Sequence, residues 1–294
     1  MPSVRTDDGV SINYYLDDYL DPWLDERSKE TIVMHPAMWE PATFVAPMVP
    51  TLARKYRCLR IDMRGRGLST APPATRTLSG GPDESTLAER QARDAMSVLD
   101  HLGIEAASWF GQGGGGLTGL AAACLRPERV KALAMSGSPL KLPASFLEAC
   151  SLGEPSMAAA LEKYGVEEFN RRGVWRQVID HTRLDSRMAA WVAAERNKVP
   201  LDVMVRTARC MQVFDFTDWL PRVTCPTLLI TADLGKSVPL EQQRYMEKAI
   251  ANARLLVYEG VGRGIHLFHA DQVARNVLDF LESQRCATMA ARRR

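Results

Sequence analysis

The chain has 294 residues, of which 46% are hydrophobic, 37 are basic and 35 are acidic. This length and composition suit one large α/β domain with an insertion, and they exclude a wholly disordered chain. The net charge of +2 gives no general reason to expect a nucleic-acid or membrane partner. We find no apolar run long enough to cross a bilayer and no signal-peptide pattern at the start.

Six cysteines are scattered along the chain without any C-x-x-C pair: Cys58, Cys124, Cys150, Cys210, Cys225 and Cys286. Such spacing does not predict a metal cluster or a disulfide framework, and it favours a reducing compartment. We therefore expect a cytoplasmic protein with no metal site.

Strands and helices are predicted to alternate through the first half of the chain. The strands are expected at 10–15, 31–35, 57–62, 106–110 and 130–135. The helices are expected at 44–56, 85–102 and 117–125, and the Gly/Pro-rich stretch at 65–83 is expected to be a loop. Alternation of this kind predicts right-handed crossovers and a largely parallel sheet.

The pattern changes to mostly helical between about residues 140 and 220. Alternation then resumes, with strands at 227–231 and 254–258 and helices at 240–251 and 270–281. We therefore predict an α/β core made of residues 1–140 and 221–294, interrupted by a helical insertion at 141–220.

Three segments carry a family resemblance: MHPAMW at 34–39, DMRGRGLS at 62–69, and GQGGGG at 111–116. The second resembles the D-x-R-G-x-G-x-S segment of the α/β-hydrolase fold superfamily, and the third stands where that family has its G-x-S-x-G nucleophile elbow. The chain looks most like small C–C, ester and lactone hydrolases of the 3-oxoadipate enol-lactonase type. The resemblance implies an α/β-hydrolase fold, a helical cap at 141–220, and structural roles for Asp62, Arg64 and Ser69.

The catalytic triad expected from the resemblance is absent at its usual places. Gly113 stands at the nucleophile position and has no side chain for acyl transfer. Gly235 stands where the acid is expected, with Asp233 two residues earlier. Arg263 follows the late Gly-x-Gly in place of histidine, and His266 lies three residues further on.

Gly113 has two interpretations, a native elbow without a nucleophile or a serine lost by substitution. The four consecutive glycines could bind an anion at a helix N-terminus, or they could serve close packing. The same run also fits the dinucleotide pattern G-x-G-x-x-G. However, no Asp or Glu follows the next strand to hold a ribose, so we do not favour that interpretation.

Each of the remaining candidate residues also has a non-catalytic interpretation. His266 could be the general base or a buried, hydrogen-bonded histidine. Asp233 could replace the missing acid or cap a turn. Arg263 could bind a substrate carboxylate or enolate, or it could be a surface arginine or pair with Glu259.

Further residues are assigned by their place in the resemblance. The N–H groups of Ala37 or Met38 and of Gly114 are expected to form an oxyanion hole. The substrate pocket is expected to involve His35, Trp39 and Gln112, with His35 mainly bracing the oxyanion loop.

Together these features predict an enzyme that acts on a small, largely apolar carbonyl metabolite without a covalent serine. Hydrolysis, decarboxylation, C–C cleavage, elimination and cyclisation all stay open as reactions, and no metal or organic cofactor is implied. The alternatives are a non-catalytic ligand-binding protein and a serine hydrolase inactivated at Gly113. A homodimer also stays open.

Overall fold

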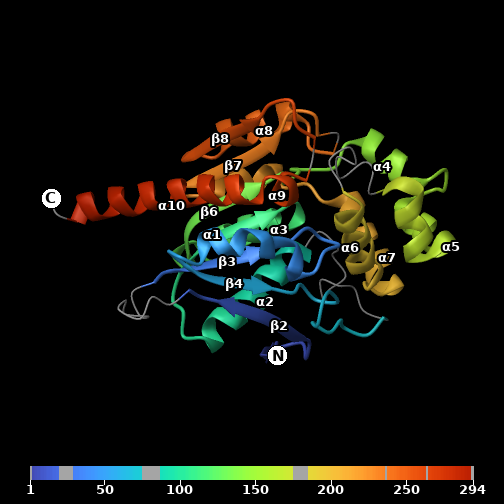
Figure 1. Cartoon of the computed structure of the whole chain (residues 1–294), viewed down its shortest axis with the longest axis horizontal. Helices are drawn as coiled ribbons and strands as arrows, with labels where there is room; N and C mark the ends of the chain where they lie inside the picture. The colour runs from blue at the N-terminus through green and yellow to red at the C-terminus, as the bar shows by residue number, and fades with distance from the viewer. Residues whose placement is uncertain are drawn as a thin grey trace.

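The computed structural model describes residues 2–19, 29–74, 87–174, 185–235, 237–262 and 264–292. An eight-stranded sheet with the order β1-β2-β4-β3-β5-β6-β7-β8 forms its centre (Figure 1). Its strands are β1 (Ser3–Arg5), β2 (Ser11–Asp17), β3 (Thr31–His35), β4 (Arg57–Ile61), β5 (Ala107–Gln112), β6 (Val130–Ser136), β7 (Thr227–Ala232) and β8 (Ala253–Tyr258). Strands β3 to β8 run parallel, while β1 and β2 pair antiparallel.

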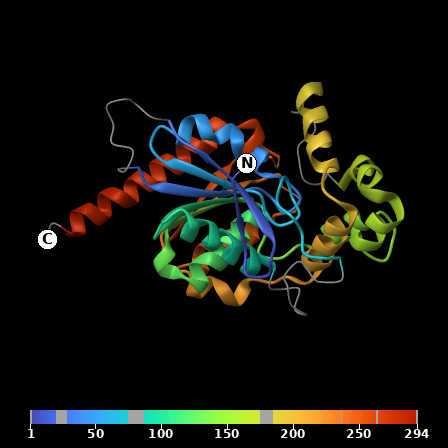
Figure 2. The ribbon, with the colours of Figure 1, turned by 90° about the horizontal axis from the view of Figure 1, so that it is seen from below.

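Helices cover both faces of this sheet. One apolar core joins it to α2 (Leu87–His101), α3 (Gly114–Leu125) and α8 (Leu240–Ala249). The opposite core joins it to α1 (Val49–Leu52) and α10 (Ala270–Arg292). Figure 2 shows these two layers on either side of the sheet, with the end of α10 projecting beyond it. The predicted α/β architecture is therefore confirmed.

Two predicted elements differ from the observed ones. The helix expected at 44–56 is split into a 3₁₀ segment, η2 (Ala42–Met48), and the short α1. Pro47 and Pro50 explain the split, because proline cannot donate the backbone hydrogen bonds of a continuous helix. Helix α10 extends well past residue 281, and the short edge strand β1 was not predicted.

The insertion forms α4 (Ala144–Ser151), α5 (Met157–Phe169), α6 (Ser186–Asn197) and α7 (Leu201–Val213). These helices gather beside one end of the sheet (Figure 1). Apolar side chains of α4, α5 and α7 form a cluster that includes Met38 and Trp39 from the loop after β3. The insertion thus covers that loop, although its description as a separate cap domain stays a prediction. Among the described residues, no helix combines the length and apolar character needed to cross a membrane.

The D-x-R-G-x-G-x-S segment holds the core together by hydrogen bonds. The carboxylate of Asp62 accepts them from the Ala42 backbone N–H at 2.7 Å and from Asn13 Nδ2 at 2.9 Å. Arg64 donates through Nε to Asp94 at 2.8 Å. These contacts agree with the structural role that the resemblance implies for the segment.

The strand order places the loops that follow β3 and β5 next to each other, because these two strands are neighbours in the sheet. From β3 the chain passes to β4 on one side and then to β5 on the other. The loops that follow β3 and β5 therefore leave the sheet in divergent directions, which opens a crevice at their carboxyl ends.

Candidate active site

A sharp turn joins β5 to α3 at Gly113, which has φ 55° and ψ −121°. Its backbone N–H donates to the Ser136 carbonyl oxygen at 2.8 Å. A positive φ is costly for residues with a Cβ, so glycine adopts this turn without strain. The turn has the place and shape of a nucleophile elbow, with a hydrogen atom where a side chain would start.

The glycines around the turn allow close packing. An added Cβ on Gly115 would lie 2.3 Å from the Pro36 carbonyl oxygen, and one on Gly116 would lie 2.0 Å from Ser138 Oγ. On Gly114 it would lie 2.1 Å from Cγ of Met38. These contacts account for the glycine run by packing alone. They also show that the Met38 side chain lies directly over Gly114.

The predicted oxyanion loop is held by buried charges. The Ala37 N–H donates to Oε2 of Glu40 at 3.3 Å. The Met38 carbonyl accepts a hydrogen bond from Nε of Arg66 at 2.7 Å. In this structure the N–H expected to bind a substrate oxygen is therefore engaged by a carboxylate of the same loop.

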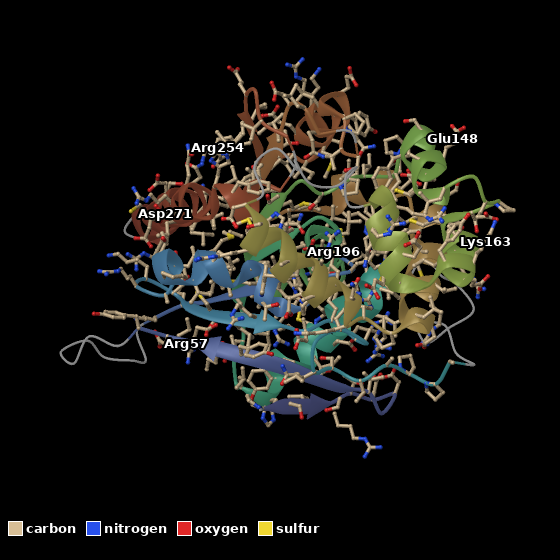
Figure 3. The ribbon with its side chains drawn as sticks, turned by 45° about the vertical axis from the view of Figure 1, so that its right-hand side comes forward. Arg57, Glu148, Lys163, Arg196, Arg254 and Asp271 are labelled. Carbon is tan, nitrogen blue, oxygen red and sulfur yellow. The ribbon has the colours of Figure 1, made fainter. Side chains whose placement is uncertain are left out.

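Three ionisable side chains from distant segments meet beneath the insertion, and we call them the charge cluster: Glu40, Arg196 and His266. Glu40 follows β3, Arg196 comes from α6, and His266 lies in α9 (Ile265–Phe268). Arg196 Nη2 forms an ion pair with Glu40 Oε1, and His266 Nε2 lies 3.9 Å from Glu40 Oε2. The residues are only 1%, 4% and 2% exposed, in the order Glu40, Arg196, His266. Figure 3 places Arg196 between the insertion and the core.

The distance between Glu40 and His266 limits what they do in this state. At 3.9 Å it exceeds a hydrogen bond, but the two groups still interact electrostatically in a buried setting. A water molecule could hydrogen-bond to both atoms across such a gap. The arrangement is therefore suited to proton transfer through water.

Asp233 takes the role of a turn cap. Its carboxylate accepts hydrogen bonds from the backbone N–H groups of Gly260 at 3.0 Å and Val261 at 3.2 Å. The Gly260 bond, together with the Val261 bond, lowers the pKa of Asp233 against the smaller effect of burial. This agrees with the turn-capping alternative and leaves Asp233 ionised in a loop connection. Arg263, the other charged candidate, lies outside the described residues.

His35 is buried in the core and stacks on Trp109, with ring centroids 5.6 Å apart. Burial lowers the pKa of His35 to about 3. The ring is therefore neutral near pH 7, which suits a bracing role better than proton transfer.

Two cavities adjoin the elbow. The first, the apolar pocket, has an empty volume of about 530 Å³ including its open side. It is lined by Ala37, Met38, Trp39, Gly114, Leu117, Pro139, Leu142, Phe146, Arg196, Met211 and Phe214. Four predicted site residues are thus brought together here, and Arg196 is the charged side chain among the described residues that line it.

The second, the polar cavity, has an empty volume of about 280 Å³ including its open side. It is lined by Gln112, Ser136, Gly137, Thr231, Ala232, Gly235, Val238, Gly264, Ile265 and His266. Gln112 and His266 therefore face a different space from Ala37, Met38 and Trp39. Glu40 pairs with Arg196, which lines the apolar pocket, and approaches His266, which lines the polar cavity.

Sequence reasoning missed Glu40 and Arg196. Glu40 directly follows the quoted segment 34–39, but no motif marks it. Arg196 lies in a helix with no functional pattern, where a charged residue normally indicates a solvated face. Among the described residues, no group of three or more His, Cys, Asp or Glu is placed to hold a metal ion.

Comparison with known proteins agrees with this geometry. A model of the α/β hydrolase fold family matches residues 30–171. A relative from Stutzerimonas stutzeri, named "Putative carbamate hydrolase RutD", is 26% identical over 90% of this chain and 96% of its own length. A 2-hydroxy-6-oxononadienedioate/2-hydroxy-6-oxononatrienedioate hydrolase from Cupriavidus pinatubonensis is 27% identical over 86% of each chain.

Solved structures show the same architecture. The enol-lactonase from Burkholderia xenovorans LB400 superimposes with a TM-score of 0.78 at 22% identity, covering 96% of this chain and 100% of the other. The family model, the solved structures and the sheet topology agree that the chain has the α/β-hydrolase fold.

Proposed function

We propose that the protein is an enzyme that acts on a small, largely apolar carbonyl metabolite without forming a covalent bond at the elbow. The observation that supports this most is the charge cluster beside the apolar pocket. Its three ionisable side chains come from separate segments and are each at most 4% exposed.

Burial of these groups costs free energy. Removing a carboxylate and a guanidinium from water costs several kcal/mol per ion, and their attraction offsets this only with good geometry. Buried ionisable groups beside a pocket are typical of catalytic sites, although structural ion pairs also occur. A purely structural link between the insertion and the core would not need His266 beside the carboxylate.

The cluster suits general acid–base catalysis by way of water. In the proposed reaction, His266 accepts a proton from a water molecule while the water oxygen adds to the substrate carbonyl carbon. The Glu40 carboxylate stabilises the imidazolium that forms. His266 then returns the proton to the leaving group as its bond to carbon breaks, so atoms and charges balance.

The elbow contributes through its backbone. Gly113 has no side-chain nucleophile, but Gly114 lines the apolar pocket at the start of α3. Its N–H can stabilise a developing oxyanion, an effect worth on the order of 3 kcal/mol per donor in related chemistry.

The pocket lining supports the substrate class. Most of its side chains are aliphatic or aromatic, including Trp39, Leu142 and Phe146, so the body of the substrate should be apolar. The relatives bear names that refer to a carbamate and to oxo-dienedioates. A carbonyl compound of similar size fits both observations.

A substrate panel tests the proposal. Small esters, lactones, carbamates and 2-hydroxy-6-oxo-dienoates are incubated with the protein, and products are measured by mass spectrometry. For any substrate turned over, Glu40→Gln and His266→Gln should each lower kcat at least about 100-fold. Intact-protein mass should show no adduct during turnover.

Matched controls separate chemistry from folding. Glu162→Gln in the insertion and His101→Gln on the surface change the same residue types away from the cluster, and they should leave kcat unchanged. Unaltered kcat in Glu40→Gln and His266→Gln, or a covalent acyl adduct, would contradict the proposal.

A second candidate function is ligand binding without turnover. It is favoured by the Met38 side chain over Gly114 and by the Ala37 N–H that donates to Glu40. It is also favoured by the lining of the apolar pocket, whose described residues include neither Glu40 nor His266. This alternative predicts saturable binding of panel compounds with no product formed.

A further inference from the structure

The polar cavity lies at the carboxyl ends of β5, β6 and β7. Gln112 ends β5 and Ser136 ends β6, and the two are paired in register on neighbouring parallel strands. Register partners point to the same face of a sheet, so their side chains lie next to each other. Both line the cavity, with exposures of 3% and 1%.

These side chains carry unsatisfied polar atoms. Oε1 of Gln112 and Oγ of Ser136 have no hydrogen-bond partner among the described residues. A buried polar atom without a partner costs about 1–3 kcal/mol. Two such atoms side by side, facing one cavity, indicate a site for a small polar molecule.

The side chains that line the polar cavity favour an anion as the ligand. His266 is the titratable side chain among the described lining residues, and none of those residues is Asp or Glu. Ser136 can donate a hydrogen bond, and a half-turn of the Gln112 amide presents its NH₂ group. A ring N–H of His266 adds a further donor, so the lining can supply three donors to an anion.

Gly235 lines the polar cavity without contributing a side chain to it. It occupies the position where the family resemblance places the acid, and an added Cβ would lie 3.3 Å from the Ala232 carbonyl oxygen and 3.8 Å from that of Val238. Contacts of this length are tight but free of a severe clash. Gly235 and His266 both line the same cavity.

We propose that the polar cavity binds a small monocarboxylate, of the size of formate or acetate, in the place of the missing acid. The Ser136 hydroxyl, the Gln112 amide and a His266 ring N–H would donate to its two oxygens. A carboxylate held there would interact with His266 much as a tethered acid would. The binding itself is non-covalent and does not require turnover, so it can be tested whether or not the proposed function holds.

Nuclear magnetic resonance provides the test. Protein labelled with ¹⁵N-histidine is titrated with sodium formate at constant ionic strength, with sodium chloride as the reference salt. The His266 ring signals are identified by their loss in His266→Gln. We expect a saturable shift of these signals with formate and none with chloride.

Four variants define the site. Ser136→Ala should weaken formate binding at least tenfold, because a hydrogen bond to a charged group is lost. Ser138→Ala is the matched control, since Ser138 is also buried with an unpartnered Oγ but does not line the cavity, and its affinity should be unchanged. Gly235→Asp should shift the His266 signals without formate and abolish formate binding, whereas Gly235→Asn should not shift them.

The outcomes are decisive in both directions. A saturable formate effect that is lost in Ser136→Ala and retained in Ser138→Ala supports the site. Absence of a saturable shift in the folded wild-type protein would overturn it, and so would equal affinity in the Ser136→Ala and wild-type proteins.

Discussion

Replacing Arg196 by methionine should destabilise the protein strongly. The Arg196–Glu40 ion pair has side-chain exposures of only 4% and 1%, so the substitution leaves Glu40 as a buried carboxylate without its counter-ion. Losing one partner of such a pair typically costs about 3–5 kcal/mol. A remaining hydrogen bond from the Ala37 N–H is too weak to replace a guanidinium, so we expect a loss in the upper part of that range.

A double variant tests whether the uncompensated charge or the lost packing causes the destabilisation. Arg196→Met combined with Glu40→Met removes both charges and keeps apolar volume, which for buried pairs is often neutral or stabilising. We therefore expect the double variant to recover most of the stability lost in Arg196→Met. This recovery would identify the uncompensated charge, and not lost packing, as the cause.

Urea unfolding followed by far-UV circular dichroism measures these effects. Arg275→Met is the control, because Arg275 pairs with Asp271 in the same i to i+4 manner as many surface pairs and both side chains are more than 60% exposed. Its effect should stay within about 0.5 kcal/mol. If Arg196→Met costs no more than Arg275→Met, or if the double variant is less stable than the single one, the charge argument is refuted.

Three further results are expected. Gly113→Ser should lower the free energy of unfolding by about 1–3 kcal/mol because residue 113 has a positive φ. The variant should not hydrolyse p-nitrophenyl acetate. Hydrolysis with an acyl adduct would instead reveal a serine hydrolase that had lost its nucleophile. Gly114→Ala should cost about 1–3 kcal/mol in urea unfolding, because its Cβ would lie 2.1 Å from Cγ of Met38. The same substitution should cost much less in a Met38→Ala background, and additive costs would disprove the contact. Burial lowers the pKa of His35 from 6.5 to about 3, so between these values the unfolded chain binds more protons and stability falls as pH falls, at about 1.4 kcal/mol per unit. The slope should flatten in His35→Asn but not in His101→Gln, and equal slopes in all three proteins would remove His35 as the cause.

Local patterns in the sequence were sufficient to predict the fold. Strands were predicted to begin at residues 31, 57 and 227, and β3, β4 and β7 begin there. The strands β3 and β7 are mostly apolar and buried along their whole length, as strands inside a parallel sheet usually are. The glycine-rich turn at 113 and the segment 62–69 are recognisable by their local residue order, although Asp62 and Arg64 make contacts with residues distant in the sequence. Such features are visible in the order of residues alone.

The helix at 44–56 shows where local patterns fail. Its apolar spacing is helical, but Pro47 and Pro50 interrupt the hydrogen bonds, and the segment becomes η2 followed by α1. Asp233 illustrates a second limit of prediction from local patterns. A carboxylate near an expected acid position can equally form hydrogen bonds to a neighbouring loop, as Asp233 does with the N–H groups of Gly260 and Val261. Spacing alone does not distinguish these two uses.

The sequence by itself determined that the chain alternates strands and helices and that residue 113 has no nucleophile. Only the tertiary structure decided which charges meet. Glu40 and Arg196 are 156 positions apart, and neither belongs to a recognisable motif. Their contact with each other and their approach to His266 depend on how α6 and α9 pack over the loop after β3. Long-range packing of this kind leaves no periodic signal in the sequence, because each residue taken alone has the pattern of an ordinary surface charge.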